Sequence, residues 1–573
     1  MKQRIIVITL IFLVTLTGIN FLHKNLLMTT AQPLDSNNDK NIIRAGISTN
    51  DFSKFEYNEV AVSSSGKYEI IDKSTGSSIA SSAGKGVFTV KVNNTAMSVY
   101  NSGRCTAQNI TGPIIFRSLD NTPFEIVGLK RKGKPALYRG DLEIVQSPTK
   151  KGTFSVVNIL PLEEYLKGVV PNELPVRFGL EALKAQTVAA RNYAIKPRTK
   201  QYSQFDICDS VECQVYFGYN TEEPLSNRAI EETKGLVALY DDDLILALYS
   251  STAGGYTENY ENAFSEPGNT KFPASSLPYL KGKPDIAGTP ALNTEEAARK
   301  FYTSSPPGFD VNSGYYRWAK SWSRSDLESV LNRNLIKYYH PAFIYPKLEK
   351  ATDIGTLQKI EVLNRGVSGK AMVVKITTSK GEWHILKELI IRRVFEHSGR
   401  LLPSANVIFD NIYDSQGNLV QVEATGGGYG HGVGMSQYGA GFMNQKGYTF
   451  DQILQHYYDG VAIGTWPITL FAQNNPITAR QTFVLLKGNA TLIINNKDQL
   501  NNFKFIINSN EITISKDELN SEKVNINLDK YTNKGLNEIV YYSPEDKKGK
   551  SIKVWVEVFE PETDKSNKKF LFF

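Results

Sequence analysis

The chain has 573 residues, of which 41% are hydrophobic and 21% charged, and its formal net charge is +7. This length is more than one hydrophobic core usually holds, so it predicts several domains, and the balanced composition excludes a wholly disordered chain. Because basic residues are interleaved with acidic ones, the small positive excess does not form the concentrated basic surface of a nucleic-acid-binding protein.

The first 31 residues have the pattern of an export signal or a single membrane anchor. Lys2 and Arg4 precede an apolar stretch at residues 5–22, and the small residues 29–31 suit a cleavage site. Residues 32–52 are polar and poor in aromatic side chains, which predicts a linker. We therefore expect an exported protein of the cell envelope or periplasm, anchored to the cytoplasmic membrane by residues 5–22 if the signal is not cleaved.

Short alternating apolar runs, separated by Gly, Asn and Ser clusters, predict a β-rich N-terminal module at residues 53–150. Helical periodicity begins at Pro161, and an amphipathic helix is predicted from Leu180 to Ile195, before Pro197. Further helices are predicted at residues 294–302, 325–333 and 450–458, and strands at residues 236–240, 244–249, 356–363, 371–377 and 406–410.

From residue 466 to residue 573 the pattern changes to short strands with polar turns, which predicts a β-sandwich-like domain. The predicted fold class is therefore α+β. A mixed helix and strand catalytic region at residues 151–465 is flanked by the N-terminal β-rich module and the C-terminal β domain.

Glu173 lies between two prolines in the segment VVPNELP, residues 169–175. Proline fixes its own φ and restricts the residue before it, so the connector holds the carboxyl with little freedom. Apolar neighbours would raise the pKa of this carboxyl and keep it protonated, as a general acid requires. The alternative is an ordinary solvated loop glutamate, which is statistically the commoner case.

Cys208 and Cys213 form a C-x4-C segment, and Cys105 is the third cysteine. The pair could supply two zinc ligands, but no histidine lies within a hundred residues of it. An exported protein is permitted disulfides, so a local bridge is favoured and Cys105 is left unpaired.

Two further segments could carry binding chemistry. Residues 250–258, SSTAGGYTE, combine hydroxyls, glycines and an acid that suit sugar hydroxyls, although alone they read as a turn. Residues 426–441 hold eight glycines around His431, which would allow close backbone approach to a ligand, and Ser436 could cap a following helix. The sequence contains no phosphate loop and no support for a nucleophilic triad.

In this order, the segments resemble the SpoIID/LytB family of stage II sporulation protein D and amidase-enhancer proteins. The resemblance covers about residues 138–460 and leaves the flanking β regions outside. The matching stretches are LPLEEYL (160–166), VVPNELP (169–175), LEALKAQTVAAR (180–191), CD to CQVY (208–216), STAGG with TE (251–258), GHGVGMSQYGA (430–440) and HYY (456–458).

The resemblance implies a lytic transglycosylase that cuts the MurNAc–GlcNAc bond of peptidoglycan glycan strands in cell-wall remodelling. Glu173 matches the catalytic glutamate, and the product would carry a 1,6-anhydro end. The alternative is a non-catalytic peptidoglycan-binding enhancer of an N-acetylmuramoyl-L-alanine amidase. The strand-binding residues expected from the matched segments are Lys184, Arg191, Ser251, Thr252, Gly254, Gly255, Glu258, His431, Ser436, Gln437 and Tyr438.

The expected partners are peptidoglycan glycan strands and a cell-wall amidase, with no nucleic acid and no cofactor. Some family members bind zinc through the two cysteines and an upstream histidine. Here residues 201–207 contain no histidine, and Glu212 stands where histidine is common. Zinc at Cys208 and Cys213 is therefore the alternative to the expected disulfide.

Overall fold

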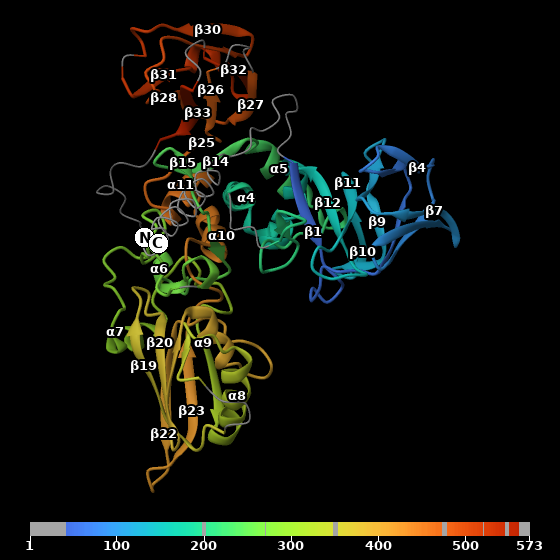
Figure 1. Ribbon diagram of the computed structural model, residues 1–573. Helices are drawn as coiled ribbons and strands as arrows, with labels where there is room; N and C mark the ends of the chain where they lie inside the picture. Colours follow the sequence, from blue (N-terminus) through green and yellow to red (C-terminus); the bar gives the residue numbers. More distant parts are fainter. Residues whose placement is uncertain are drawn as a thin grey trace, which may run out of the picture.

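The computed structural model describes residues 42–196, 202–269, 271–347, 353–472, 478–519, 521–544 and 549–560. It has the expected mixed α+β architecture, in which strands outnumber helices. Figure 1 shows a helical centre, an N-terminal β region on its right, a C-terminal β domain above it and an inserted module below it. The predicted signal lies outside the described residues. Within those residues, no helix has the length and apolar character needed to cross a bilayer.

The N-terminal region consists of two antiparallel-rich sheets around a shared core. One has the strand order β13-β1-β12-β11-β8-β3-β4 and the other the order β10-β9-β2-β5-β6-β7. Alternate side chains are buried along strands such as β2, β5 and β6. The strands are β1 (Ile42–Ile47), β2 (Glu59–Ser64), β3 (Tyr68–Asp72), β4 (Ser77–Ser82), β5 (Val87–Asn93), β6 (Ala96–Asn101), β7 (Arg104–Ile110), β8 (Ile114–Ser118), β9 (Phe124–Arg131), β10 (Lys134–Tyr138), β11 (Asp141–Gln146), β12 (Phe154–Pro161) and β13 (Ile207–Cys208).

Strand β1 corrects the expected linker, which was placed as far as residue 52. Ile43, Ala45 and Ile47 alternate along this strand and are buried, and β1 pairs antiparallel with β12. The six-residue run is short and sits in a polar neighbourhood, so its alternation gives a weak sequence signal. The β region also continues past residue 150, because β12 and β13 belong to the same sheet.

The helical centre is built around α4 (Leu180–Ile195), which has the predicted bounds. Small residues at Ala182, Ala185, Ala189 and Ala190 let neighbouring helices approach it, and nearly every side chain of its middle turns is buried. The surrounding helices are α2 (Leu162–Lys167), α3 (Val170–Glu173), α5 (Pro224–Glu232), α10 (Gln437–Gln445) and α11 (Phe450–Tyr457), with the 3-10 turns η1 (Val176–Phe178) and η2 (Tyr219–Thr221).

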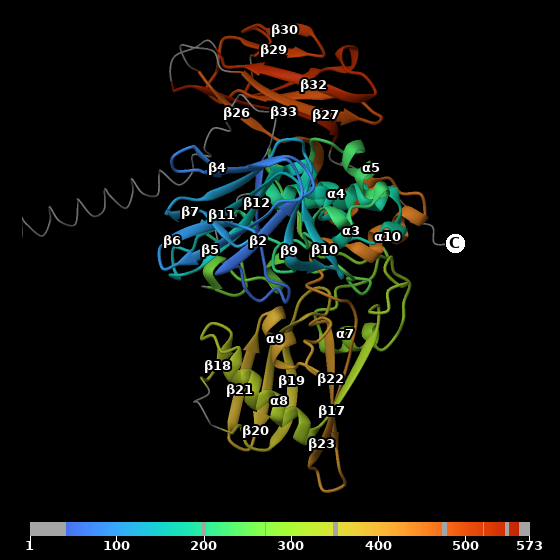
Figure 2. The same cartoon turned by 90° about the vertical axis from the view of Figure 1, so that its right-hand side faces the viewer.

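Residues between about 260 and 426 form an inserted module, and residues 318–424 of it have a hydrophobic core of their own, at the bottom of Figures 1 and 2. Its two sheets have the orders β17-β23-β22 and β18-β21-β20-β19, and α8 and α9 pack on them. The elements are α6 (Tyr260–Ala263), η3 (Pro267–Asn269), α7 (Glu295–Tyr302), β17 (Trp318–Ser323), α8 (Arg324–Lys337), β18 (Ile344–Tyr345), β19 (Leu357–Arg365), β20 (Ala371–Thr378), β21 (Gly381–Leu386), α9 (Glu388–Val394), β22 (Val407–Tyr413) and β23 (Leu419–Gly426).

The C-terminal β domain shares a sheet with the centre, so the expected boundary at residue 465 runs through that sheet. Its order is β15-β14-β25-β33-β28-β31, with β26 also paired to β33, and a second sheet has the order β27-β32-β29-β30. The elements are β14 (Leu236–Tyr240), β15 (Asp243–Leu244), β25 (Ala462–Thr465), β26 (Ile468–Phe471), β27 (Thr478–Leu485), β28 (Thr491–Asn495), β29 (Phe503–Ile507), β30 (Asn510–Ile514), β31 (Lys523–Asn527), η4 (Asp529–Tyr531), β32 (Gly535–Tyr542) and β33 (Ser551–Phe559).

Candidate functional site

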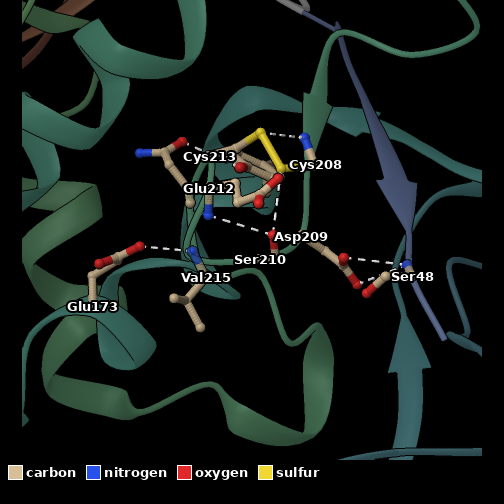
Figure 3. The surroundings of a disulfide bond; sticks show 10 residues. Ser48, Glu173, Cys208, Asp209, Ser210, Glu212, Cys213 and Val215 are labelled. Carbon is tan, nitrogen blue, oxygen red and sulfur yellow. Dashed lines mark hydrogen bonds between the residues drawn. A yellow bond between two sulfur atoms is a disulfide. The ribbon is translucent and has the colours of Figure 1, made fainter. Parts of the chain in front are cut away.

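Glu173 is the last residue of the short helix α3, and the chain leaves this helix in an extended conformation at Leu174. Its backbone carbonyl accepts a hydrogen bond from Gln437 Nε2 at 2.9 Å, which ties α3 to α10. Its carboxylate Oε1 accepts a hydrogen bond from the Val215 backbone N–H at 2.6 Å, drawn in Figure 3. Three distant parts of the chain therefore fix the position of this one carboxyl group.

The Glu173 side chain is half-buried beside Val170 and Leu174, which are fully buried. Burial raises the pKa of the carboxyl to about 7, because the charged form loses hydration. The Val215 N–H and the Gln437 side chain act in the opposite direction by stabilising the carboxylate. At neutral pH both protonation states are populated, so the group can give a proton and take one back.

A buried polar cluster surrounds Glu173. Tyr249 has a raised pKa because of its burial and of the nearby Glu173 charge, and its hydroxyl accepts a hydrogen bond from Gln214 Nε2 at 3.1 Å. Gln214 Oε1 accepts from the Tyr165 hydroxyl at 3.2 Å, and Gln437 Nε2 also reaches Gln186 Oε1 at 3.3 Å. Gln186, Gln214 and Tyr249 lie within or beside the matched motifs, but periodicity could not show that they face this carboxyl.

The segment that carries the Val215 N–H is held by a disulfide and a buried ion pair. Cys208 and Cys213 are bonded, with their Cα atoms 5.4 Å apart, and Cys105 is a free, exposed thiol. Asp209 accepts hydrogen bonds from Ser48 N at 3.1 Å and from Arg131 Nη2 at 2.7 Å (the Ser48 contact is drawn in Figure 3). The bridge ends two residues before Val215, so it restrains the donor that contacts Glu173.

The residues near the cysteines do not fit the zinc site of some family members. Both sulfur atoms are used in the disulfide. Nowhere in the described ranges do three His, Cys, Asp or Glu side chains gather in a way that could hold a metal ion.

The two expected strand-binding segments meet at a short parallel pair of strands. β16 (Tyr249–Ser250) pairs with β24 (Met435–Ser436), and the Tyr438 N–H donates to the Ser251 carbonyl at 3.0 Å. Ser436 caps α10 by accepting from the Gly439 N–H, as expected from the sequence. Ser251 and Tyr438 remain partly exposed, whereas Gln437 is largely buried against Glu173.

Other residues of the segment 250–258 make hydrogen bonds that join the centre to the inserted module. Thr252 is buried and shares a hydrogen bond of 2.7 Å with Ser313 of the inserted module. The Gly254 N–H donates to Asp310 Oδ2 at 2.9 Å, and Gly255 is also buried.

Glu258 corrects an expectation, because it is fully buried and does not reach a surface where a glycan could bind. Its carboxylate accepts five hydrogen bonds from within the chain. The donors are the backbone N–H groups of Asn259, Val367 and Ser368, the Asn262 amide and the Ser368 hydroxyl. Every strong acceptor direction is used, so Glu258 holds a loop of the inserted module against the centre.

Lys184 and Arg191 also differ from expectation, because both side chains are buried in ion pairs on α4. Lys184 Nζ lies 2.7 Å from Glu181 and 2.6 Å from Glu232. Arg191 makes a two-pronged contact with Glu163 and donates to the Leu236 carbonyl. These ion pairs pack α4 against its neighbours, and burial keeps both side chains away from a surface where a glycan could bind.

His431 is half-buried between the centre and the inserted module. Its Nδ1 accepts a hydrogen bond from the Val433 N–H at 3.1 Å, and its ring lies edge-on to Phe264. Burial and the nearby charges of Lys370 and Arg392 lower its pKa to about 4, against the opposing effect of Glu388. The ring is therefore neutral at pH 7 and can act as a polar contact but not as a cation.

The glycines around His431 are explained by close packing within the chain. A Cβ at Gly434 would lie 2.2 Å from the Leu248 carbonyl oxygen, and one at Gly439 would lie 1.9 Å from the Tyr457 hydroxyl. Several neighbouring glycines face similar obstructions from the centre or the inserted module. The expectation that these glycines admit a ligand is therefore replaced by a packing role.

Comparison with known proteins identifies two regions. Residues 150–240 match the family model described as stage II sporulation protein, and residues 266–434 match a domain of unknown function. The amidase enhancer of Bacillus subtilis is 33% identical over 315 residues, covering 52% of this chain but only 40% of that protein. An uncharacterized protein of Brachyspira hyodysenteriae is 30% identical, over 54% of this chain and 68% of its own length. Stage II sporulation protein D of Bacillus subtilis is 29% identical, over 56% and 79%.

Proposed function

Because the chain belongs to the SpoIID/LytB family, we propose that it acts in cell-wall remodelling as a lytic transglycosylase with Glu173 as its acid. The observation that supports this most is the state of the Glu173 carboxyl. It is half-buried, held by the Val215 N–H, and has a pKa of about 7. A group with this pKa can protonate a leaving group at neutral pH and accept a proton in the next step.

The proposed reaction uses one carboxyl group for both proton transfers. Glu173 protonates the glycosidic oxygen as the bond from muramyl C1 to that oxygen breaks. The carboxylate then takes the proton of the muramyl 6-hydroxyl, whose oxygen bonds to C1 and forms the 1,6-anhydro ring. No water enters, so the paired carboxylates of an ordinary glycosidase are not needed. No second acid contributes to the raised pKa of Glu173.

A second candidate is a non-catalytic, peptidoglycan-binding enhancer of a cell-wall amidase. It is favoured by the similarity to a protein named amidase enhancer. In that case Glu173 would help to bind the strand, and the amidase would be the partner that cuts the wall. Either role places the protein in the cell envelope. Fusing residues 1–41 to a reporter tests that location, and a reporter that stays inside the cell would contradict it.

Digestion of purified glycan strands by wild type, Glu173→Gln and Glu212→Gln tests the proposal. Glu212 is an exposed carboxyl in the neighbouring disulfide loop, so Glu212→Gln is a matched control. Removing a general acid should lower the cleavage rate on the order of 10²–10⁴-fold. The control should keep wild-type activity. An active Glu173→Gln variant would contradict the assignment, and wild type that cuts nothing but stimulates an added amidase would favour the enhancer.

A further inference from the structure

A pocket of about 240 Å³ lies beside the candidate site, between η1, α10 and a loop of the inserted module. Its lining residues are Arg177, Phe178, Asn312, Tyr438, Gly441, Phe442 and Gln445. Two of its lining residues are close in the chain to the site, because Arg177 follows Glu173 by four residues and Tyr438 follows Gln437, which donates to the Glu173 carbonyl. Pockets for drug-sized ligands run from roughly 300 Å³ upwards, so this one suits a single ring.

The lining combines aromatic rings with polar groups, which is the chemistry that holds a sugar. Phe178 and Tyr438 meet edge to face with ring centroids 4.8 Å apart, and Phe442 completes the aromatic wall. Rings of this kind pack against the apolar C–H face of a pyranose, while the Asn312 and Gln445 amides can bond its hydroxyl or acetamido groups.

Arg177 adds a charge preference to the pocket. Its side chain is exposed, and its guanidinium lies 5.2 Å from the centre of the Phe178 ring. No acidic residue lines the pocket, and all of its lining residues lie in the described part of the chain. The guanidinium can therefore pair with a carboxylate of the ligand.

The inserted module fixes its part of the pocket in advance. Asp310 Oδ2 accepts hydrogen bonds from the Ala253 N–H at 2.6 Å and from the Ser436 hydroxyl at 3.0 Å. Ser313 is bonded to Thr252, so the loop is anchored on both sides of the exposed Asn312. The same loop presents Tyr315, which is 42% exposed and contacts the equally exposed Tyr429, with ring centroids 4.4 Å apart and ring planes tilted by 44°. A loop held so firmly loses little entropy when a ligand binds.

We propose that this pocket is a subsite for a carboxylate-bearing N-acetylated sugar of a glycan strand, built jointly by the centre and the inserted module. The proposal rests on the proposed function for the identity of the strand. In this proposal, the domain of unknown function at residues 266–434 extends the strand-binding surface beyond Glu173.

Binding measurements in a Glu173→Gln background test the subsite without turnover. The probes are glycan strands with free muramyl carboxylates and chitotetraose, which has no carboxylate. Arg177→Gln and Asn312→Ala change exposed side chains, so folding is not at risk. Arg104→Gln, on the distant strand β7, removes an exposed charge as a control.

Arg177→Gln should weaken binding of the muramyl strands about tenfold, the loss expected for one charge-assisted hydrogen bond, and should leave chitotetraose binding unchanged. Asn312→Ala should weaken both probes, and Arg104→Gln neither. Affinities of both pocket variants within about twofold of the parent would overturn the subsite, even if wild type cleaves strands. Conversely, a wild type that cleaves nothing, with binding still lost in the pocket variants, would refute the proposed reaction and keep the subsite.

Discussion

Replacing Glu173 by Gln should stabilise the folded protein at alkaline pH, although it removes the proposed acid. The carboxyl has a pKa of about 7 in the folded state, against 4.5 as its usual value. Between these two values the folded state keeps a proton that the unfolded state has lost, so stability falls as pH rises. The difference, 7 − 4.5, multiplied by 1.36 kcal/mol per pKa unit gives a loss of about 3 kcal/mol once the pH exceeds 7.

Urea unfolding at pH 4 and at pH 8.5 measures this effect. Hydrogen exchange into α4 should be the readout, because it reports the helical centre separately from the β regions of a multidomain chain. Wild type and Glu173→Gln should be equally stable at pH 4, and the variant should be more stable by about 3 kcal/mol at pH 8.5. Glu212→Gln should follow wild type throughout. Parallel pH dependence of wild type and Glu173→Gln would show that the carboxyl titrates normally and would refute the reasoning.

Two further predictions concern the support of the site. The denatured protein should give one reactive thiol, Cys105, before reduction and three after it, and reduction of the Cys208–Cys213 bridge should lower the free energy of unfolding by about 2 kcal/mol. Three thiols before reduction, or stoichiometric zinc, would contradict the bridge. Glu258→Gln should lower the free energy of unfolding by about 1–3 kcal/mol, because an amide NH₂ would face groups that donate hydrogen bonds. The folded fraction should bind glycan normally. Unchanged stability with loss of glycan binding would show that Glu258 contacts the ligand after all.

Local patterns predicted the local structure well. The apolar spacing before Pro197 predicted α4 with the bounds that the structure shows, and the region from residue 450 forms α11 as expected. Ser436 caps its helix, and Glu173 lies on the short connector that the prolines indicated. Each of these features depends on residues within a few positions of one another.

Features that depend on distant contacts could not be predicted in this way. The motif around Arg191 contains no acidic partner for it, because its partner Glu163 comes close only when α2 packs on α4. Glu258 finds its donors at Val367 and Ser368, more than a hundred residues away. The separate core of the inserted module and the strand pairing of β25 with β33 have no signal in local periodicity.

The product formed in water enriched with ¹⁸O tests the central claim most directly. Purified glycan strands would be digested in H₂¹⁸O, and the new ends would be identified by mass. Internal attack by the muramyl 6-hydroxyl, with Glu173 moving the proton, predicts 1,6-anhydro ends that contain no ¹⁸O in wild type and no new ends in Glu173→Gln. Reducing ends that carry ¹⁸O would show attack by water and contradict the one-carboxyl mechanism.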